Sequence, residues 1–211
     1  MAAATGIQKS PKSTSTGSRI VDSIGTPTYP TNGLWTVLTT TTICAPVSVV
    51  LEASLDISTW PKWNTFVPRV DIVSSLPTST STSTSTKLEV GTVARFHNKL
   101  KDNDPTLSAS DHNIISIDKI EKRGRVEERD GWCIVWKTIG IPGGDWVLRV
   151  ERVQELVEVM SESGAVETQY KAWGTFGGPV AYLLQWNGTR GDIAARFEDW
   201  ANDLKNYVEG G

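Results

Sequence analysis

The stretch GGPVAYLLQWNGTRGDIAARFEDWANDLKNYV, residues 177–208, decides the fold class of this chain. At about 100° per residue its large apolar side chains fall on one narrow stripe, which predicts a long helix packed against a core. Pro179 suits the first helical turn, and Gly210 and Gly211 end the helix. The stripe consists of Tyr182, Trp186, Ile193, Phe197, Trp200, Leu204 and Tyr207.

The apolar stripe is interrupted by residues 187–191, NGTRG, where Thr189 and Arg190 take positions that should be apolar. Two interpretations follow from this interruption. The glycines could kink a continuous core helix, since each weakens a helix by about 1 kcal/mol. Alternatively, the helix stops packing here and faces a ligand or the entrance of a pocket.

Length and composition predict one soluble domain. The chain has 211 residues and a net charge of −3, so it has no general attraction to nucleic acid or to an anionic membrane surface. Cys44 and Cys133 are too few to stabilise a domain by disulfides, and no apolar run approaches the ~20 residues that span a bilayer. These features favour a cytoplasmic protein with neither a nucleic-acid partner nor integral membrane association.

Residues 1–32 are rich in Ala, Ser, Thr, Gly and Pro, and this composition predicts a disordered N-terminal tail. Lys9, Lys12 and Arg19 precede the first acidic residue, Asp22, as in a mitochondrial presequence, although no amphipathic helical face accompanies them. A mitochondrial location therefore stays open beside the cytoplasmic one.

The rest of the chain, residues 33–209, predicts an α+β domain in which strands precede the long helix. A short helix at 46–57 and a turn at 60–64 follow the first strand, and a Ser/Thr-rich loop insertion occupies 77–87. The closely spaced turns of the C-terminal half join neighbouring strands antiparallel. The expected strands are 34–43, 65–74, 90–101, 114–120, 124–129, 132–140, 146–159 and 166–176.

Several short sequence segments are similar to those of the START/Bet v 1-like superfamily, in its branch of polyketide cyclases and coenzyme Q-binding proteins. They are WPKWNTFVP at 60–68, VGTVARF at 90–96, WVLRVERVQEL at 146–156 and FEDWANDLKNYVE at 197–209. This resemblance implies a helix-grip fold, in which a curved antiparallel sheet of about six or seven strands wraps around the C-terminal helix. It also implies a hydrophobic cavity between that sheet and the helix.

The sequence carries none of the common catalytic motifs. GxSxG, HExxH, CxxC and P-loop patterns are missing, and there are only two histidines. Asp102, Asp104, Asp111 and His112 lie close in sequence, but acidic loop residues are usually solvated, so we expect neither a metal site nor a cofactor.

Strand alternation selects the candidate pocket residues. Polar residues in register with apolar neighbours are the most informative, because a buried polar group needs a partner or a ligand. Tyr170 is the candidate catalytic residue, as a hydrogen-bond donor to a carbonyl, although it could also be an ordinary core tyrosine. Arg152 could contact a ligand or pair with a carboxylate at the rim. The candidate ligand-binding residues are Phe96, Asn98, Trp136, Trp146, Leu148, Arg152, Thr168, Tyr170, Trp186, Thr189 and Arg190.

Nine tryptophans, together with the resemblance and the absence of a nucleophile motif, favour an internal pocket for an aromatic or polyketide-like small molecule. Cyclisation or dehydration of that molecule is one hypothesis for the pocket. A non-enzymatic lipid or quinone carrier is the alternative. A third hypothesis is an interaction module with a collapsed cavity, like those that some helix-grip relatives form on chaperones.

Overall fold

The computed structural model describes residues 15–31, 33–74, 86–100, 112–126 and 129–210. Within these residues, eight strands form one antiparallel sheet in the order β1-β2-β8-β7-β6-β5-β4-β3. The strands are β1 Gly17–Asp22, β2 Trp35–Ile43, β3 Arg69–Ser74, β4 Val93–His97, β5 His112–Val126, β6 Arg129–Ile139, β7 Arg149–Met160 and β8 Val166–Gly177. The helices are α1 Val47–Leu55, α2 Trp60–Trp63, α3 Pro179–Trp186 and α4 Thr189–Glu209, with the 3-10 turn η1 at Gly144–Trp146.

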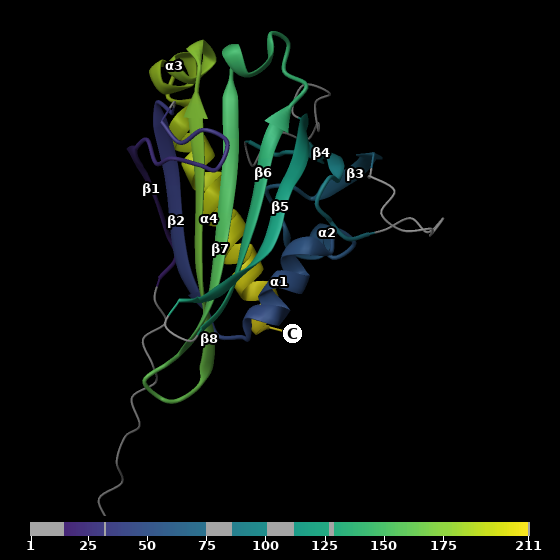
Figure 1. Cartoon of the computed structure of the whole chain (residues 1–211), viewed down its shortest axis with the longest axis vertical. Coiled ribbons are helices and arrows are strands. Elements are labelled where there is room, and N and C mark those ends of the chain that lie inside the picture. Colours follow the sequence, from purple (N-terminus) through teal and green to yellow (C-terminus); the bar gives the residue numbers. More distant parts are fainter. Residues whose placement is uncertain (1–14, 32, 75–85, 101–111, 127–128, 211) are drawn as a thin grey trace, which may run out of the picture.

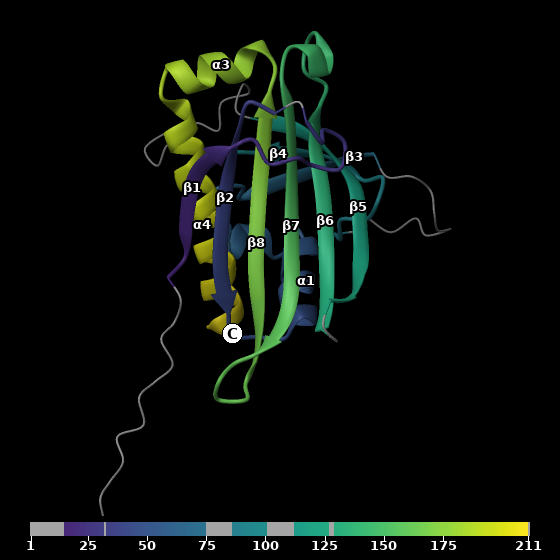
Figure 2. The same ribbon diagram turned by 60° about the vertical axis from the view of Figure 1, so that its left-hand side comes forward.

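The sheet curves around α4, with α1 and α2 beside its lower part (Figure 1). A view turned by 60° shows α4 running down one side of the sheet from α3 to the C-terminus (Figure 2). This arrangement confirms the predicted α+β helix-grip fold. The second strand, β2, and the last, β8, are neighbours, so the chain folds back on itself before α4 closes the concave side.

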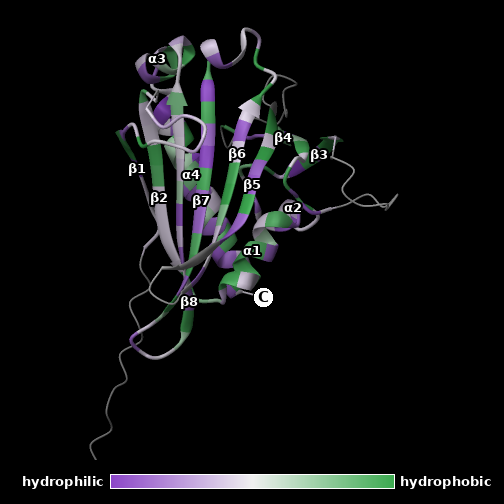
Figure 3. Ribbon diagram, in the orientation of Figure 1, coloured by the Kyte–Doolittle hydropathy of each residue, from purple (hydrophilic) through white to green (hydrophobic). Residues whose placement is uncertain are grey.

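Both faces of the sheet carry a core because successive strand residues point to opposite faces and β7 places an apolar side chain on each, Leu156 in one core and Val153 in the other. Figure 3 shows hydrophobic and hydrophilic residues interspersed along β7. The main core, on the concave face, joins the sheet to α1, α2 and α4 through residues such as Trp60, Trp200 and Leu204. A smaller core on the other face contains Leu38, Cys133, Val135, Val153 and Trp173. The N-terminal residues Val21 and Ile24 pack against this second core.

The prediction of a disordered tail is wrong for its second half. Residues 17–22 form β1, which pairs with β2 from Gly17–Thr40 to Asp22–Trp35. The tail after β1 then crosses the convex face (Figure 2), where Ile24 and Gly25 accept hydrogen bonds from Thr175 and Trp173. Composition missed this strand because its stabilisation comes from a neighbouring strand and from side chains of β8, rather than from its own apolar content. Residues 1–14 and 32 lie outside the described residues.

The predicted continuous C-terminal helix is two helices. Gly188 has φ 83°, a left-handed conformation that terminates α3, and α4 begins at the next residue. Ile193, Phe197, Trp200 and Leu204 are buried as predicted, but Tyr182 and Trp186 are exposed on α3. The interruption is therefore a helix break that turns the first part of the stripe away from the core.

The expected strands are present with shifted ends. The strand expected from residue 146 begins at Arg149, because Gly143 and Gly144 adopt positive φ angles and direct the chain into η1. The strand expected at 90–101 is shorter, at Val93–His97. Strand β5 runs through the expected segment 114–120 and the first three residues of the expected segment 124–129. The Ser/Thr-rich insertion falls largely on residues 75–85, which lie outside the described residues.

Candidate functional site

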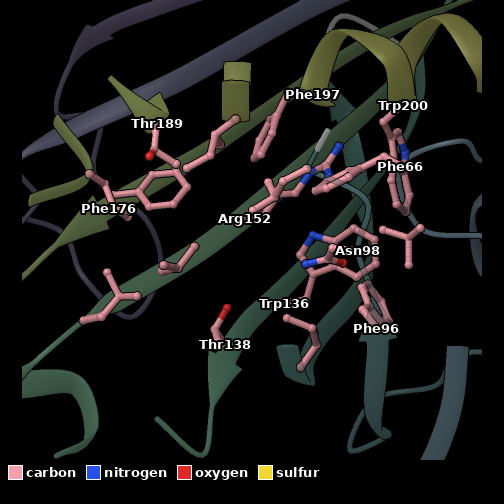
Figure 4. A pocket seen from close by; sticks show the side chains of 17 residues that line it. Phe66, Phe96, Asn98, Trp136, Thr138, Arg152, Phe176, Thr189, Phe197 and Trp200 are labelled. Atoms are coloured by element: carbon pink, nitrogen blue, oxygen red, sulfur yellow. The ribbon is translucent and has the colours of Figure 1, made fainter. Parts of the chain in front are cut away.

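A cavity of about 230 Å³ lies between the concave face of the sheet and α4 (Figure 4). Its walls come from β4, β5, β6, β7 and β8 on the sheet side and from α3 and α4 on the helix side. The lining residues are Phe66, Val67, Phe96, Asn98, Leu100, Ile115, Trp136, Thr138, Leu148, Val150, Arg152, Phe176, Leu184, Thr189, Ile193, Phe197 and Trp200. Most of them are apolar or aromatic, so the cavity suits an apolar molecule.

Arg152 is the only charged residue among the described residues of this lining, and its side chain lies among aromatic rings (Figure 4). Its guanidinium carbon is 4.2 Å from the ring centroid of Phe197, 4.6 Å from that of Trp200 and 5.5 Å from that of Trp136. Cation–π attraction of this kind is worth about 2 kcal/mol when the cation is desolvated. The rings therefore offset part of the cost of burying the charge.

Arg152 makes one hydrogen bond, from Nη2 to Tyr170 Oη at 3.3 Å. No carboxylate in the described part of the chain lies within ion-pair distance of it, and its buried Nε has no hydrogen-bond partner there. Burial lowers the pKa of Arg152, whereas the nearby Tyr170 raises it. Burial also raises the pKa of Tyr170, so its hydroxyl is protonated at neutral pH.

Gly174 makes room for the ring that covers Arg152. It faces Arg152 across the β7–β8 pair, and a Cβ at this position would lie 2.6 Å from Cζ of Phe197. Atoms that close clash, so a larger residue would displace Phe197. The glycine on β8 thus determines how closely α4 approaches the guanidinium.

Packed aromatic rings form one wall of the pocket. Trp136 and Trp200 meet edge to face at 5.4 Å, and Phe96 meets Trp136 at the same distance. Behind them Trp60 is fully buried and contacts Trp200 at 4.9 Å. Such arrangements hold rings rigidly, so this wall of the pocket is preformed.

Six of the eleven predicted ligand-binding residues line the pocket. They are Phe96, Asn98, Trp136, Leu148, Arg152 and Thr189. Their contact with a ligand stays a prediction. Strand alternation found the first five because it identifies which side chains point to the concave face.

The other five predicted residues lie elsewhere. Trp146 is 75% exposed on η1, and Trp186 is 87% exposed on α3. Thr168 is buried and donates to the carbonyl of Ala45 at 2.7 Å, while Tyr170 is 1% exposed in the main core. Arg190 is half-buried at the start of α4 and does not line the pocket. Tyr170 reaches the pocket only through Arg152.

The prediction omitted several lining residues. Ile193, Phe197 and Trp200 belong to the predicted helical stripe, but a stripe does not reveal which of its members face a cavity. Thr138 follows Trp136 in strand alternation and could have been found in that way. Phe66, Val67 and Leu100 lie outside the named strands, where no periodicity marks them.

Besides Arg152, the described residues offer few side chains that could take part in catalysis or hold a metal ion. No group of three or more His, Cys, Asp or Glu side chains that could hold a metal ion occurs among the described residues. Asp102, Asp104 and Asp111 lie outside them. His97 Nε2 is 2.8 Å from Asp71 Oδ2 and takes no part in the pocket lining. In the described helices, no segment is long and apolar enough to cross a membrane.

The curved sheet, α4 and the cavity between them define a helix-grip protein with an internal apolar pocket. The chain is 30% identical over 194 residues to oxopyrrolidines biosynthesis cluster protein O of Penicillium oxalicum, covering 89% of this chain and 93% of that protein. The chain therefore belongs to the same protein family as that Penicillium protein. No model of a known protein family matches it.

Two solved structures are similar to this chain at low sequence identity. A hypothetical protein from Helicobacter pylori is 12% identical with a TM-score of 0.54, and the match covers 99% of both chains. The protein Ara h 8.0201 is 15% identical with a TM-score of 0.48, over 83% of this chain and 98% of its own. At 12% identity the likeness to the Helicobacter protein concerns the fold alone.

Proposed function

We propose that this protein binds a hydrophobic small molecule in the pocket between the sheet and α4. The observation that carries the proposal is the preformed, largely apolar cavity at the centre of the concave face. The Penicillium relative, named for a cluster of oxopyrrolidine biosynthesis, supports a role on an intermediate of small-molecule biosynthesis.

The size of the cavity favours a compact ligand. An engineered protein cavity of about 150 Å³ holds benzene, so the roughly 230 Å³ available here suits a molecule of one or two rings. A long-chain lipid or a quinone with a polyprenyl tail needs more room. The pocket therefore favours an aromatic or polyketide-like ligand over the lipid or quinone carrier of the alternative hypothesis.

Cyclisation or dehydration of the ligand is the catalytic form of this proposal. Arg152 is the group placed to stabilise negative charge that develops on a ligand carbonyl oxygen. Tyr170 is buried behind it and would act as a positioning residue through its hydrogen bond to the guanidinium. Enclosure by aromatic walls would hold the reacting chain folded.

A pocket-blocking variant tests the binding function. Leu148 lines the cavity, so Leu148→Trp fills it, whereas Leu183→Trp makes the same change on the exposed face of α3. Binding of 2-acetylnaphthalene and 2-naphthoate is measured by isothermal titration calorimetry. The proposal expects saturable 1:1 binding that Leu148→Trp abolishes and Leu183→Trp retains. Equal binding by the wild type and Leu148→Trp would place the ligand elsewhere and overturn it.

A further inference from the structure

Among the residues that the structure describes, the pocket contains a positive charge without a matching negative charge. Arg152 is 8% exposed, and none of the other lining residues is acidic. An isolated buried charge is costly, and buried charges in proteins are normally paired. The aromatic rings and one phenol around Arg152 do not neutralise it.

The nearest acidic residue in the sequence is turned away from the pocket. Glu151 lies on the convex face, where its carboxylate accepts hydrogen bonds from Thr28 N at 2.9 Å and Thr28 Oγ1 at 2.6 Å. Successive strand residues point to opposite faces, so Glu151 and Arg152 are separated by the sheet itself. Glu151 is engaged with the N-terminal segment and is no partner for Arg152.

The donors of the guanidinium are largely unused. A guanidinium has five N–H donors in one plane, and only the bond to Tyr170 Oη is formed within the described chain. The guanidinium carbon lies over the rings of Phe197 and Trp200. Because the N–H donors lie in the plane of the guanidinium, an acceptor approaches in that plane, which is the geometry in which arginine binds a flat pair of oxygens.

We propose that Arg152 recognises a delocalised, singly charged pair of oxygens on the ligand, either a carboxylate or the enolate of a 1,3-dicarbonyl group. This inference rests on the proposed binding function and names the chemical class of the ligand. The acidic group lies against Arg152, and the apolar remainder of the ligand lies against the aromatic and aliphatic walls.

Two matched pairs of probes test the charge preference. The first pair is 2-naphthoate and the nearly isosteric neutral 2-naphthamide. The second is 3-acetyl-5-benzylpyrrolidine-2,4-dione, which ionises to an enolate whose acetyl and C4 oxygens lie on the same side, and its neutral 4-O-methyl enol ether. Dissociation constants of all four are measured by calorimetry for the wild type, Arg152→Met and the control Arg19→Met, whose arginine is exposed on β1.

We expect the wild type to bind the anionic member of at least one pair about tenfold or more tightly than the neutral member, because the anion forms charge-assisted hydrogen bonds in a buried site. Arg152→Met should remove this preference while still binding the neutral probe, and Arg19→Met should keep it. Preference for the carboxylate pair or for the enolate pair identifies the source of the charge.

The experiment distinguishes a failure of the role of Arg152 from a failure of the binding function. Equal affinity for the charged and neutral members of both pairs, or a preference that survives in Arg152→Met, overturns the role of Arg152 and leaves the binding function standing. If none of the four probes binds wild type, the binding function and the role of Arg152 both fail.

Discussion

Arg152 Nη2 and Tyr170 Oη lie 3.3 Å apart, and this hydrogen bond is the only one that the guanidinium makes within the described chain. Both side chains project from the concave face, from β7 and β8. The phenol contacts the pocket only through the arginine. The pair therefore couples the main core to the wall of the pocket.

Replacement of Tyr170 by phenylalanine removes this hydrogen bond without changing the packing volume. We expect Tyr170→Phe to lower the free energy of unfolding by roughly 1–2 kcal/mol, because the bond is buried and charge-assisted. Urea denaturation measures this change. In an Arg152→Met background the same substitution should cost clearly less, and an equal cost in both backgrounds would show that the two side chains are not coupled.

We expect the buried charge of Arg152 to lower the stability of the fold while it serves ligand binding. Replacing it with methionine removes a buried charge that has no carboxylate partner in the described part of the chain, but keeps an apolar chain of similar length. We expect Arg152→Met to raise the free energy of unfolding by about 1 kcal/mol, since the removed desolvation cost exceeds the lost cation–π contacts. A fall of similar size would identify Arg152 as a structural residue instead.

Gly174 should be sensitive to a single methyl group. Because a Cβ there would meet the ring of Phe197, Gly174→Ala should lower the free energy of unfolding by about 1–3 kcal/mol and weaken ligand binding. Gly191 on α4 is the matched control, since a Cβ there meets nothing within 4 Å. Gly191→Ala should raise stability by up to about 1 kcal/mol. Thermal denaturation of the two variants would contradict this account if both changed in the same direction.

The N-terminal segment should contribute to folding. Glu151 is fully buried and holds the backbone N–H and hydroxyl of Thr28. Glu151→Ala should lower the free energy of unfolding by about 1–3 kcal/mol, because it removes the two hydrogen bonds that the buried carboxylate accepts from Thr28. Glu162→Ala, in the exposed turn between β7 and β8, is the control and should change little. Similar denaturation midpoints for these two variants would mean that the segment is not held by Glu151.

Sequence patterns predicted the sheet and the burial of α4 well because both depend on simple periodicities. Alternation placed Phe96 and Asn98 together, and likewise Leu148 and Arg152, because a strand has a fixed period of two. The stripe from Ile193 to Leu204 identified the buried face of α4. These features are local, and one sequence is enough to reveal them.

The set of residues that line the pocket was harder to predict. It depends on how far along each strand a residue lies and on which other elements pack over it. Tyr170 shares the correct face with the pocket residues, yet it lies under the main core, and alternation does not distinguish these positions. Trp186 fitted the helical stripe, but the left-handed Gly188 rotates α3 out of line. Among the described residues no carboxylate pairs with Arg152, since Glu151 points to the opposite face and binds Thr28, a contact that sequence patterns do not reveal.

A crystal structure of the wild-type protein with 2-naphthoate tests the central claim most directly. The account predicts density for the naphthalene ring between the sheet and α4, beside Trp136 and Phe197, with the carboxylate within hydrogen-bond distance of Arg152. A saturating ligand that binds on the outer surface while this pocket stays unoccupied would contradict the account.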